Sequence, residues 1–435
     1  MALGGGIFLT QNKILPGVYI NFVSAARATA NLSDRGIATI PLILDWGVQN
    51  EVKPVTTGDF QKDSLKLFGY DYAAPELKGL RDLFKNINIA YLYRLGKGGK
   101  KASNKFATAI YTGTIGNKLT VGITKNVDKE ENFDVSLFFD GNPVETQIVS
   151  SSKDLKDNDF VIWDKTVTLD SEALTSGMPL KGGASPEIQN DDYQAYLDLI
   201  EGYSFNAIGC PSDDDNIKGL FTAFTKRLRD EQGVKFQCVV YDKAADYEGV
   251  VNVKNETLDS KDKWSAVYWV TGVVAGTAVN KSALNKVYDG EYTLDVNFKQ
   301  SELENAIKTG KFAFHRVGSD IRVLADINSL VSLEKGEDFK QNQTIRVIDQ
   351  IANDIAVLFN TKYLGIVPND ASGRISLWAD IVLHHEQLQK IRAIENFSDK
   401  NIIVEQGISK RSVVVYDRIT VVNAMAQLYM TVTVA

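Results

Sequence analysis

The sequence predicts a multidomain protein of α/β and α+β class, with a central α/β domain, an inserted β-sandwich-like domain and a C-terminal α+β domain. The first observation is an alternation of strand and helix patterns that starts near residue 36, stops near residue 96 and resumes near residue 186. The second is that the interruption consists of short strands divided by turns. The third is a pair of long amphipathic helices that follow residue 340 and lead into a β-rich tail.

The two α/β stretches predict strands and helices in turn. The first contains strands at 36–46 (GIATIPLILDW) and 87–95 (INIAYLYRL), with helices at 60–69 and 75–86 between them. The second contains helices at 191–203 and 213–233, and strands at 204–210 (SFNAIGC) and 234–242 (VKFQCVVYD). Because the pattern resumes after the interruption, we interpret both stretches as one domain.

The interruption predicts a small all-β unit. Its strands lie at 105–113, 118–125, 133–149 and 160–170, and Asp140-Gly141-Asn142-Pro143 predicts a hairpin turn. GKGGKK and LKGGASPE flank it, and Gly-rich segments of this kind are typical of solvated linkers. We therefore expect an independently folding insert whose two ends lie close together.

The C-terminal part predicts helices at 342–365 and 374–395, followed by the β-rich tail at 401–435. The predicted organisation has six segments: an N-terminal arm and strand at 1–24, the first part of the central domain at 25–96, the insert at 97–185, the second part of the central domain at 186–330, the C-terminal domain at 331–420 and a C-terminal arm strand at 421–435.

Both ends of the chain show the alternation of a strand with one apolar face. The apolar positions are Val18, Ile20 and Phe22 near the start, and Leu428, Met430, Val432 and Val434 at the end. A strand leaves costly unpaired donors and acceptors unless it joins a sheet. The pattern alone leaves open whether that sheet belongs to the same subunit or to a neighbour.

Composition excludes several classes of partner. The net charge of −7 over 435 residues favours neither nucleic acid nor an anionic membrane. The longest apolar run, AVYWVTGVVAGTAV, is shorter than the roughly 20 residues of a membrane span. Cys210 and Cys238 lie in apolar strand patterns, so we expect buried thiols in a protein made in a reducing cytoplasm. The start of the chain shows no secretion signal, so we expect release from the cell by lysis.

The residues that could carry chemistry form no catalytic constellation. His384 and His385 are neighbours that point about 100° apart on a helix, so we interpret them as helix surface or satisfied core rather than as metal ligands. In GCPSDDDN, Cys210 could act as a nucleophile and the three aspartates could bind a cation, but a turn and a helix cap explain the same residues. GKGGKK lacks the spacing of a phosphate loop. We expect no catalytic residue, cofactor or metal.

Four stretches resemble the tail sheath protein of contractile phage tails, in the branch found in Gram-positive bacteria, their prophages and their R-type bacteriocins. They are GGGIFLTQNKILPGVYINFVSA, WVTGVVAGTAVNKSALNKVYDGE, IRVIDQIANDIAVLFNTKYLGIVPNDASGR and AMAQLYMTVTVA. The likeness extends nearly end to end and is weakest in the insert. In the second stretch, Gly272 and Gly276 lie four apart in an apolar helix, which permits close packing.

The resemblance implies a helical sheath of stacked sixfold rings around an inner tube, which contracts to drive the tube through a target cell envelope. Its partners would be further copies of itself, the tail tube, the baseplate and the tail terminator. It also implies that the N-terminal and C-terminal arm strands complete the C-terminal domain of other subunits. The alternatives are a tube or baseplate component of the same apparatus and a cytoplasmic α/β enzyme with an inserted β domain.

Overall fold

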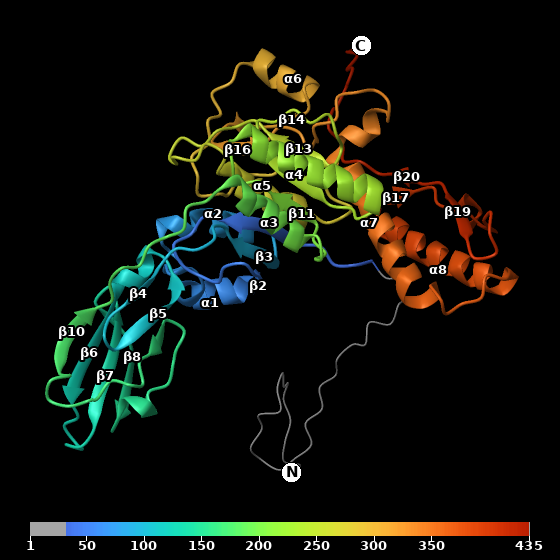
Figure 1. Cartoon of the computed structure of the whole chain (residues 1–435). Coiled ribbons are helices and arrows are strands. Elements are labelled where there is room, and N and C mark those ends of the chain that lie inside the picture. Colours follow the sequence, from blue (N-terminus) through green and yellow to red (C-terminus); the bar gives the residue numbers. More distant parts are fainter. Residues whose placement is uncertain (1–31, 435) are drawn as a thin grey trace, which may run out of the picture. The chain divides into compact units, whose positions relative to one another are not determined.

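The computed structural model describes residues 32–434 (Figure 1). Contacts divide this chain into two compact units. The larger unit comprises Asp34–Gln350 with the segment from Val421, and the smaller comprises Ile351–Thr420 with Leu32 and Ser33.

The larger unit is built on a seven-stranded sheet in the order β14-β13-β12-β11-β1-β3-β2. All neighbouring pairs are parallel except β2 and β3, which are antiparallel. Pro54 lies in β2, which the sequence analysis missed, and an edge strand tolerates a residue without a backbone donor. The strands are β1 (Ile37–Leu42), β2 (Val52–Thr56), β3 (Ile89–Arg94), β11 (Ala207–Gly209), β12 (Gln237–Tyr241), β13 (Val250–Val253) and β14 (Lys311–Phe312).

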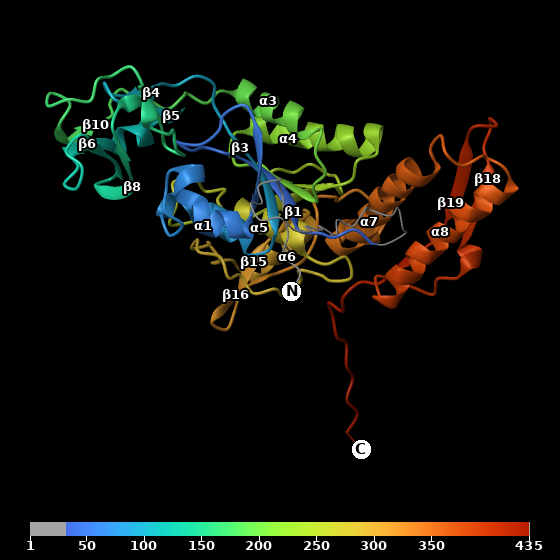
Figure 2. The same cartoon turned by 90° about the horizontal axis from the view of Figure 1, so that it is seen from below.

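Helices cover both faces of this sheet, so the predicted α/β domain has three layers (Figure 2). Successive strand residues point to opposite faces, and the two faces build separate apolar cores. One core packs against α1 (Thr57–Phe68), α2 (Lys78–Phe84) and α5 (Ala266–Gly276). The other packs against α3 (Asn190–Ile200) and α4 (Asp215–Arg227). The remaining elements of this domain are α6 (Gln300–Lys308) and the hairpin of β15 (Phe314–Val317) and β16 (Asp320–Val323).

The close packing expected at Gly272 and Gly276 is confirmed. Both glycines face the end of α2, where a Cβ added to Gly272 would lie 2.5 Å from the Leu83 carbonyl oxygen and one added to Gly276 would lie 1.6 Å from that of Asn86. No side chain fits at such distances, so glycine at both positions lets α5 lie directly against the α2 backbone.

The insert is an all-β unit of two sheets that share one core. Its turn follows the prediction, because Asp140 and Gly141 both have positive φ and form a two-residue loop between paired Phe139 and Asn142. One sheet has the order β4-β5-β9 and the other β10-β6-β7-β8. The strands are β4 (Lys101–Ser103), β5 (Ala107–Thr112), β6 (Leu119–Lys125), β7 (Phe133–Phe139), β8 (Asn142–Val149), β9 (Val161–Trp163) and β10 (Thr175–Pro179).

The borders of the insert are more ordered than solvated linkers. Lys100 and Ala184 exchange two backbone hydrogen bonds of 2.8 and 3.0 Å, so the two ends of the insert lie side by side. GKGGKK is predicted to be a solvated linker, and its lysines are indeed exposed, but antiparallel pairing fixes the backbone from Lys100 onward. Glycine composition alone does not reveal such pairing, because the partner lies more than 80 residues away.

The insert also contacts the central domain through Trp46. This side chain follows β1, is fully buried and belongs to the core of the insert, with its ring centroid 5.2 Å from that of Tyr111. Nearby, the Asp45 carboxylate accepts hydrogen bonds from the hydroxyls of Thr114 and Ser185, at 2.7 and 2.5 Å. The insert is therefore held by packing and hydrogen bonds as well as by its two connections.

Replacing residues 98–184 with a short Gly/Ser linker should leave a soluble protein that unfolds cooperatively. The paired ends allow a short closure, and exposing Trp46 should cost about 2 kcal/mol. Size-exclusion chromatography and a thermal melt followed by circular dichroism measure both. A second deletion that also carries Trp46→Gln removes the exposed indole. If both variants only aggregate, the insert is part of the core of the central domain.

The smaller unit contains long helices and two short two-stranded ladders, of which β18 with β19 is antiparallel. Its core contains Leu358, Tyr363, Leu377, Ile381 and Ile402, from both helices and the following strand. The helices are α7 (Asn342–Leu358), whose first turns belong to the larger unit, and α8 (Ala371–Lys390). The strands are β17 (Ile394–Glu395), β18 (Ile402–Gln406), β19 (Val413–Asp417) and β20 (Thr420–Val421).

The predicted mixed multidomain fold class is thus confirmed.

Candidate functional site

The C-terminal arm extends from residue 422 to residue 434 without a partner strand in the described chain (Figure 2). The apolar positions Leu428, Met430, Val432 and Val434 are 71–91% exposed. Tyr429, on the opposite side of the alternation, is also exposed. Neither face of the predicted strand is therefore buried within residues 32–434.

The first residues of this arm are anchored to the larger unit. Gln343, at the start of α7, donates to the Val422 carbonyl oxygen at 3.0 Å and accepts from the Ala424 amide at 3.0 Å. The side chains of Thr344 and Asn423 are 3.2 Å apart. The arm is therefore fixed at residues 422–424 and exposed beyond them.

Strands β18 and β19 form a hairpin with two open edges. Val404 pairs with Val415 at its centre, and no third strand joins it in the described part of the chain. One face packs on α8, where the Trp378 indole donates to the Ile402 carbonyl oxygen at 3.1 Å. A two-stranded ladder is marginal by itself, and each open edge presents unpaired backbone groups. The hairpin has the geometry of a sheet that further strands could complete.

The N-terminal arm positions Val18, Ile20 and Phe22 lie outside the described residues, so their prediction stays a prediction.

The histidine pair lies in the core, one of the two expected alternatives; His384 is hydrogen-bonded, whereas His385 Nε2 has no hydrogen-bond partner in the described chain. His384 and His385 are buried in α8, and each has a carboxylate 2.9 Å from its Nε2: Asp354 for the first and Asp417 for the second. Among residues 32–434, no group of three or more His, Cys, Asp and Glu side chains could hold a metal ion.

In the segment GCPSDDDN, the structure shows the helix cap rather than a cation site. The Asp214 carboxylate accepts from the amides of Asn216 and Ile217, at 2.8 and 3.1 Å, and so caps α4. Cys210 and Cys238 are both buried free thiols, as predicted, and burial raises the pKa of Cys238 to about 12. A thiol that stays protonated is a poor nucleophile.

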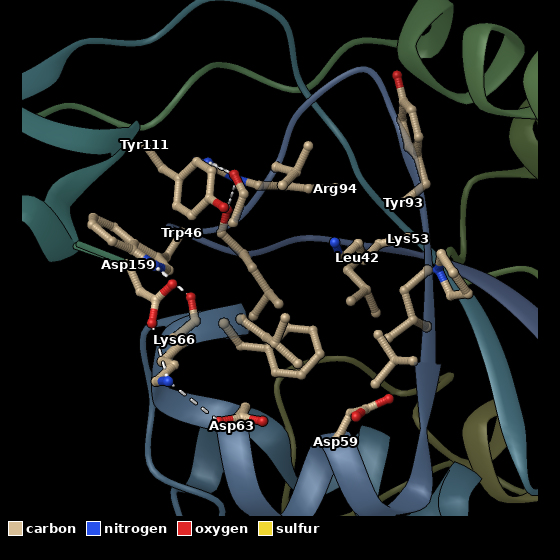
Figure 3. Close-up of a pocket in the computed structure, with 18 of the residues that line it drawn as sticks. Leu42, Trp46, Lys53, Asp59, Asp63, Lys66, Tyr93, Arg94, Tyr111 and Asp159 are labelled. Atoms are coloured by element: carbon tan, nitrogen blue, oxygen red, sulfur yellow. Dashed lines mark hydrogen bonds and ion pairs between the residues drawn. The ribbon is translucent and has the colours of Figure 1, made fainter. Parts of the chain in front are cut away.

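A cavity of about 520 Å³ lies between α1, the ends of the central strands and the insert (Figure 3). Trp46 and Tyr111 form one wall, and Lys66 reaches from α1 to Asp159 of the insert at 3.0 Å. Arg94 is almost fully buried, and its guanidinium donates to the carbonyl oxygens of Leu44 and Gly47 at 2.8 and 3.0 Å. Burial lowers the pKa of Arg94 to about 10, so it remains charged at neutral pH. The Trp46–Tyr111 contact and the Lys66–Asp159 ion pair join the insert to the central domain, whereas Arg94 fixes the segment that follows β1.

Asp82, in α2, is a fully buried carboxyl. Its Oδ1 accepts from the Glu291 amide at 2.8 Å, and its Oδ2 lies 3.3 Å from the Tyr288 hydroxyl. Burial raises the pKa of Asp82 from 3.8 to about 6. Because the folded pKa lies above the unfolded one, stability falls as pH rises from about 4 through about 6.

Asp82→Asn should therefore raise the free energy of unfolding at pH 8, by at most about 3 kcal/mol. Asparagine stays neutral, can accept from Glu291 and can donate to Tyr288. Thermal melts of both proteins at pH 4.5 and pH 8 measure the effect, and the difference between them should be small at pH 4.5. A variant that is less stable than the parent at pH 8 would contradict this account.

The described residues contain no helix that is both long and apolar enough to cross a membrane. A multidomain chain with an exposed apolar arm and an open-edged hairpin has the features of a structural subunit built for assembly. Comparison with known proteins identifies the family.

Four segments match phage tail sheath families in chain order. Residues 35–95 match the tail sheath protein Gp18 domain III N-terminal region, and 97–185 match the phage tail sheath protein beta-sandwich domain. Residues 187–329 match the phage tail sheath protein central domain, and 334–435 match the phage tail sheath C-terminal domain.

Proteins that are similar to this chain over nearly its whole length point to the same family. The phage-like element PBSX protein XkdK of Bacillus subtilis (strain 168) is 31% identical, over 99% of this chain and 100% of the relative. The crystal structure of a sheath tail protein from Desulfitobacterium hafniense is 36% identical, covers 90% of this chain and 93% of that one, and has a TM-score of 0.78. The contracted helical sheath of the anti-feeding prophage shares the fold, with 13% identity, a TM-score of 0.59 and coverage of 97% and 99%.

The chain belongs to the phage tail sheath family, a family of structural proteins rather than enzymes. The resemblance read from the sequence is thereby confirmed, and the enzyme alternative is set aside. Sequence reasoning missed the burial of Trp46 by the insert and the buried Arg94. The only signal for either was an aromatic or charged residue at the end of a predicted strand.

Proposed function

We propose that this sheath subunit polymerises as stacked sixfold rings into a helical sheath around an inner tube, and that the sheath contracts to drive the tube through a target cell envelope. The observation that carries the proposal is the exposed C-terminal arm in a chain that also has a hairpin with two free edges. A head-to-tail contact that does not close on itself generates an open helical filament.

The arms would supply the missing strands. We infer that Leu428, Met430, Val432 and Val434 of one subunit, and Val18, Ile20 and Phe22 of another, add to the open edges of β18 and β19 in a third. Residues 425–434, which follow the anchored residues, span at most about 35 Å when extended, so the arm can project well away from its anchor. Backbone hydrogen bonds give such strand addition its strength, and alternate side chains give it specificity.

The other partners in this proposal are the tail tube, the baseplate and the tail terminator. The sheath would be made in the bacterial cytoplasm, in a phage or an R-type bacteriocin particle released by lysis. Electron microscopy of the protein co-expressed with its tube and baseplate tests the proposal. Helical tubes with sixfold symmetry support it, and uniform monomers under these conditions would contradict it.

Contraction should need no nucleotide. The driving force we propose is additional buried surface between subunits in the short state, so the energy is stored when the extended sheath assembles. Extended particles exposed to mild acid or denaturant should shorten in nucleotide-free buffer that contains a chelator. Particle lengths in negative-stain images measure this, with untreated particles as the control. An absolute requirement for ATP would contradict the mechanism.

A further inference from the structure

Five side chains of the smaller unit form a continuous line of polar contacts. Ser33 Oγ donates to Asp354 Oδ1 at 2.5 Å, and Asp354 Oδ2 lies 2.9 Å from His384 Nε2. The Nδ1 atoms of His384 and His385 are 3.5 Å apart, and His385 Nε2 lies 2.9 Å from Asp417 Oδ2. We call these five residues the polar line.

The polar line joins two places where the chain leaves the smaller unit, after Ser33 and close to Thr420. Ser33 ends the stretch that follows the N-terminal arm, and its neighbour Leu32 donates its amide to Gln387 of α8 at 3.3 Å. Asp417 is the last residue of β19 and lies four residues before Val421, where the C-terminal segment begins. We call Leu32 with Ser33 the N-terminal root, and Asp417 with Arg418 the C-terminal root.

The middle of the line is buried and the ends are accessible. The side chains of Asp354, His384 and His385 are 6%, 1% and 0% exposed, whereas that of Asp417 is 26% exposed. A buried polar group that loses its partner costs more than the hydrogen bond it made. Loss of Ser33 or Asp417 at the ends of the line would therefore destabilise the buried residues between them.

The orientations of the two imidazoles depend on each other. The Ile381 carbonyl oxygen lies 2.9 Å from His385 Nδ1 and can only accept, so Nδ1 carries a hydrogen. His385 Nε2 meets Asp417 at ion-pair distance, although outside hydrogen-bond geometry. The two rings pack edge to face with their centroids 5.3 Å apart, so a rotation of one displaces the other.

We propose that the polar line positions both arm roots together, so that displacement of one root loosens the other. The inference rests on the proposed exchange of arms and deepens it. In a polymer linked by both arms, displacement of the chain at one root of the smaller unit would then change how firmly that unit holds the chain at the other root. Asp354, His384 and His385 act here as positioning residues.

Hydrogen exchange of the full-length monomer, read by mass spectrometry, tests the coupling. Asp417→Ala removes one end of the line at a partly exposed site, and the Leu32 and Ser33 amides should then exchange about fivefold faster. Asp417→Asn keeps a polar side chain of the same size beside His385 Nε2 and should restore most of the protection. Because coupling is reciprocal, Ser33→Ala should speed exchange of the Arg418 amide, which donates to the Asn401 carbonyl oxygen, by a similar factor.

Asp380→Ala is the matched control. Asp380 also lies on α8 and holds Lys362 at 2.6 Å, but it is not part of the polar line. It should leave exchange at both roots unchanged within about twofold. The proposal is overturned if Asp417→Ala leaves the N-terminal root unchanged, if the effect occurs in one direction only, or if Asp380→Ala has the same effect.

The readout is separate from the test of the proposed function. Monomer exchange measures the coupling, whereas electron microscopy of the parent protein measures assembly. Uncoupled roots in a protein that forms tubes would refute the polar line alone. Coupled roots in a protein that never forms tubes would support the line and refute the sheath architecture.

Discussion

Replacing Thr431 and Val432 together with proline should abolish sheath assembly while the monomer keeps its stability. Proline removes the backbone donor, and because neighbouring donors point to opposite sides of a strand, at least one of the two must face a partner. Both residues are exposed in the described chain, so the free energy of unfolding should change by at most about 1 kcal/mol. The lost pairing recurs at every subunit of the filament, so the effect on assembly is far larger.

Two measurements on the same variant check this prediction. A melting curve reports on the monomer, and sedimentation or negative-stain imaging after co-expression with tube and baseplate reports on assembly. Alanines at the same two positions keep both backbone donors and serve as the control, which should still assemble. A monomer grossly destabilised by the prolines would show that the last strand belongs to the sheet of its own subunit.

Gly276→Ala should destabilise the larger unit by about 3 kcal/mol, or prevent its folding. The added methyl group would lie 1.6 Å from the Asn86 carbonyl oxygen, and backbone cannot move aside as a flexible side chain does. Relief requires α5 to shift away from α2, and the core between α5 and the sheet would then lose contacts.

Gly219→Ala is the matched control for this substitution. Gly219 lies inside α4, and a Cβ added there meets no atom within 4 Å. Alanine is the better helix former, so this variant should be stabilised by about 0.5 kcal/mol. Chemical denaturation followed by fluorescence compares both variants with the parent. Equal stability of all three proteins would show that α5 and α2 separate easily.

Features that depend on neighbours in the chain were predictable. The α/β alternation, the loop at Asp140 and Gly141 and the cap at Asp214 all follow from short-range rules of periodicity, positive φ and side-chain capping. The two glycines of α5 also signalled close packing, although not its partner. The family resemblance rested on longer motifs, and the comparisons confirmed it.

Features that depend on distant residues were not predictable from pattern. Strand β2 was missed because Pro54 argues against a strand, and only its place at the edge of the sheet makes proline acceptable. The paired borders of the insert were interpreted as linkers because their partners are far apart in sequence. The fold brings distant chain segments together, and these segments decide which partner a residue contacts.

By itself the sequence determined the class of each domain, the buried thiols, the alternation of the last strand and the family, since all of these are written in composition, period and motif. The tertiary structure alone decided that Trp46 is buried by the insert, that the C-terminal arm is exposed on both faces and that Ser33 and Asp417 lie at two ends of one buried polar line. The physical reason is distance along the chain. Ser33 and Asp354 are 321 residues apart, and only a folded backbone brings such groups within hydrogen-bonding range.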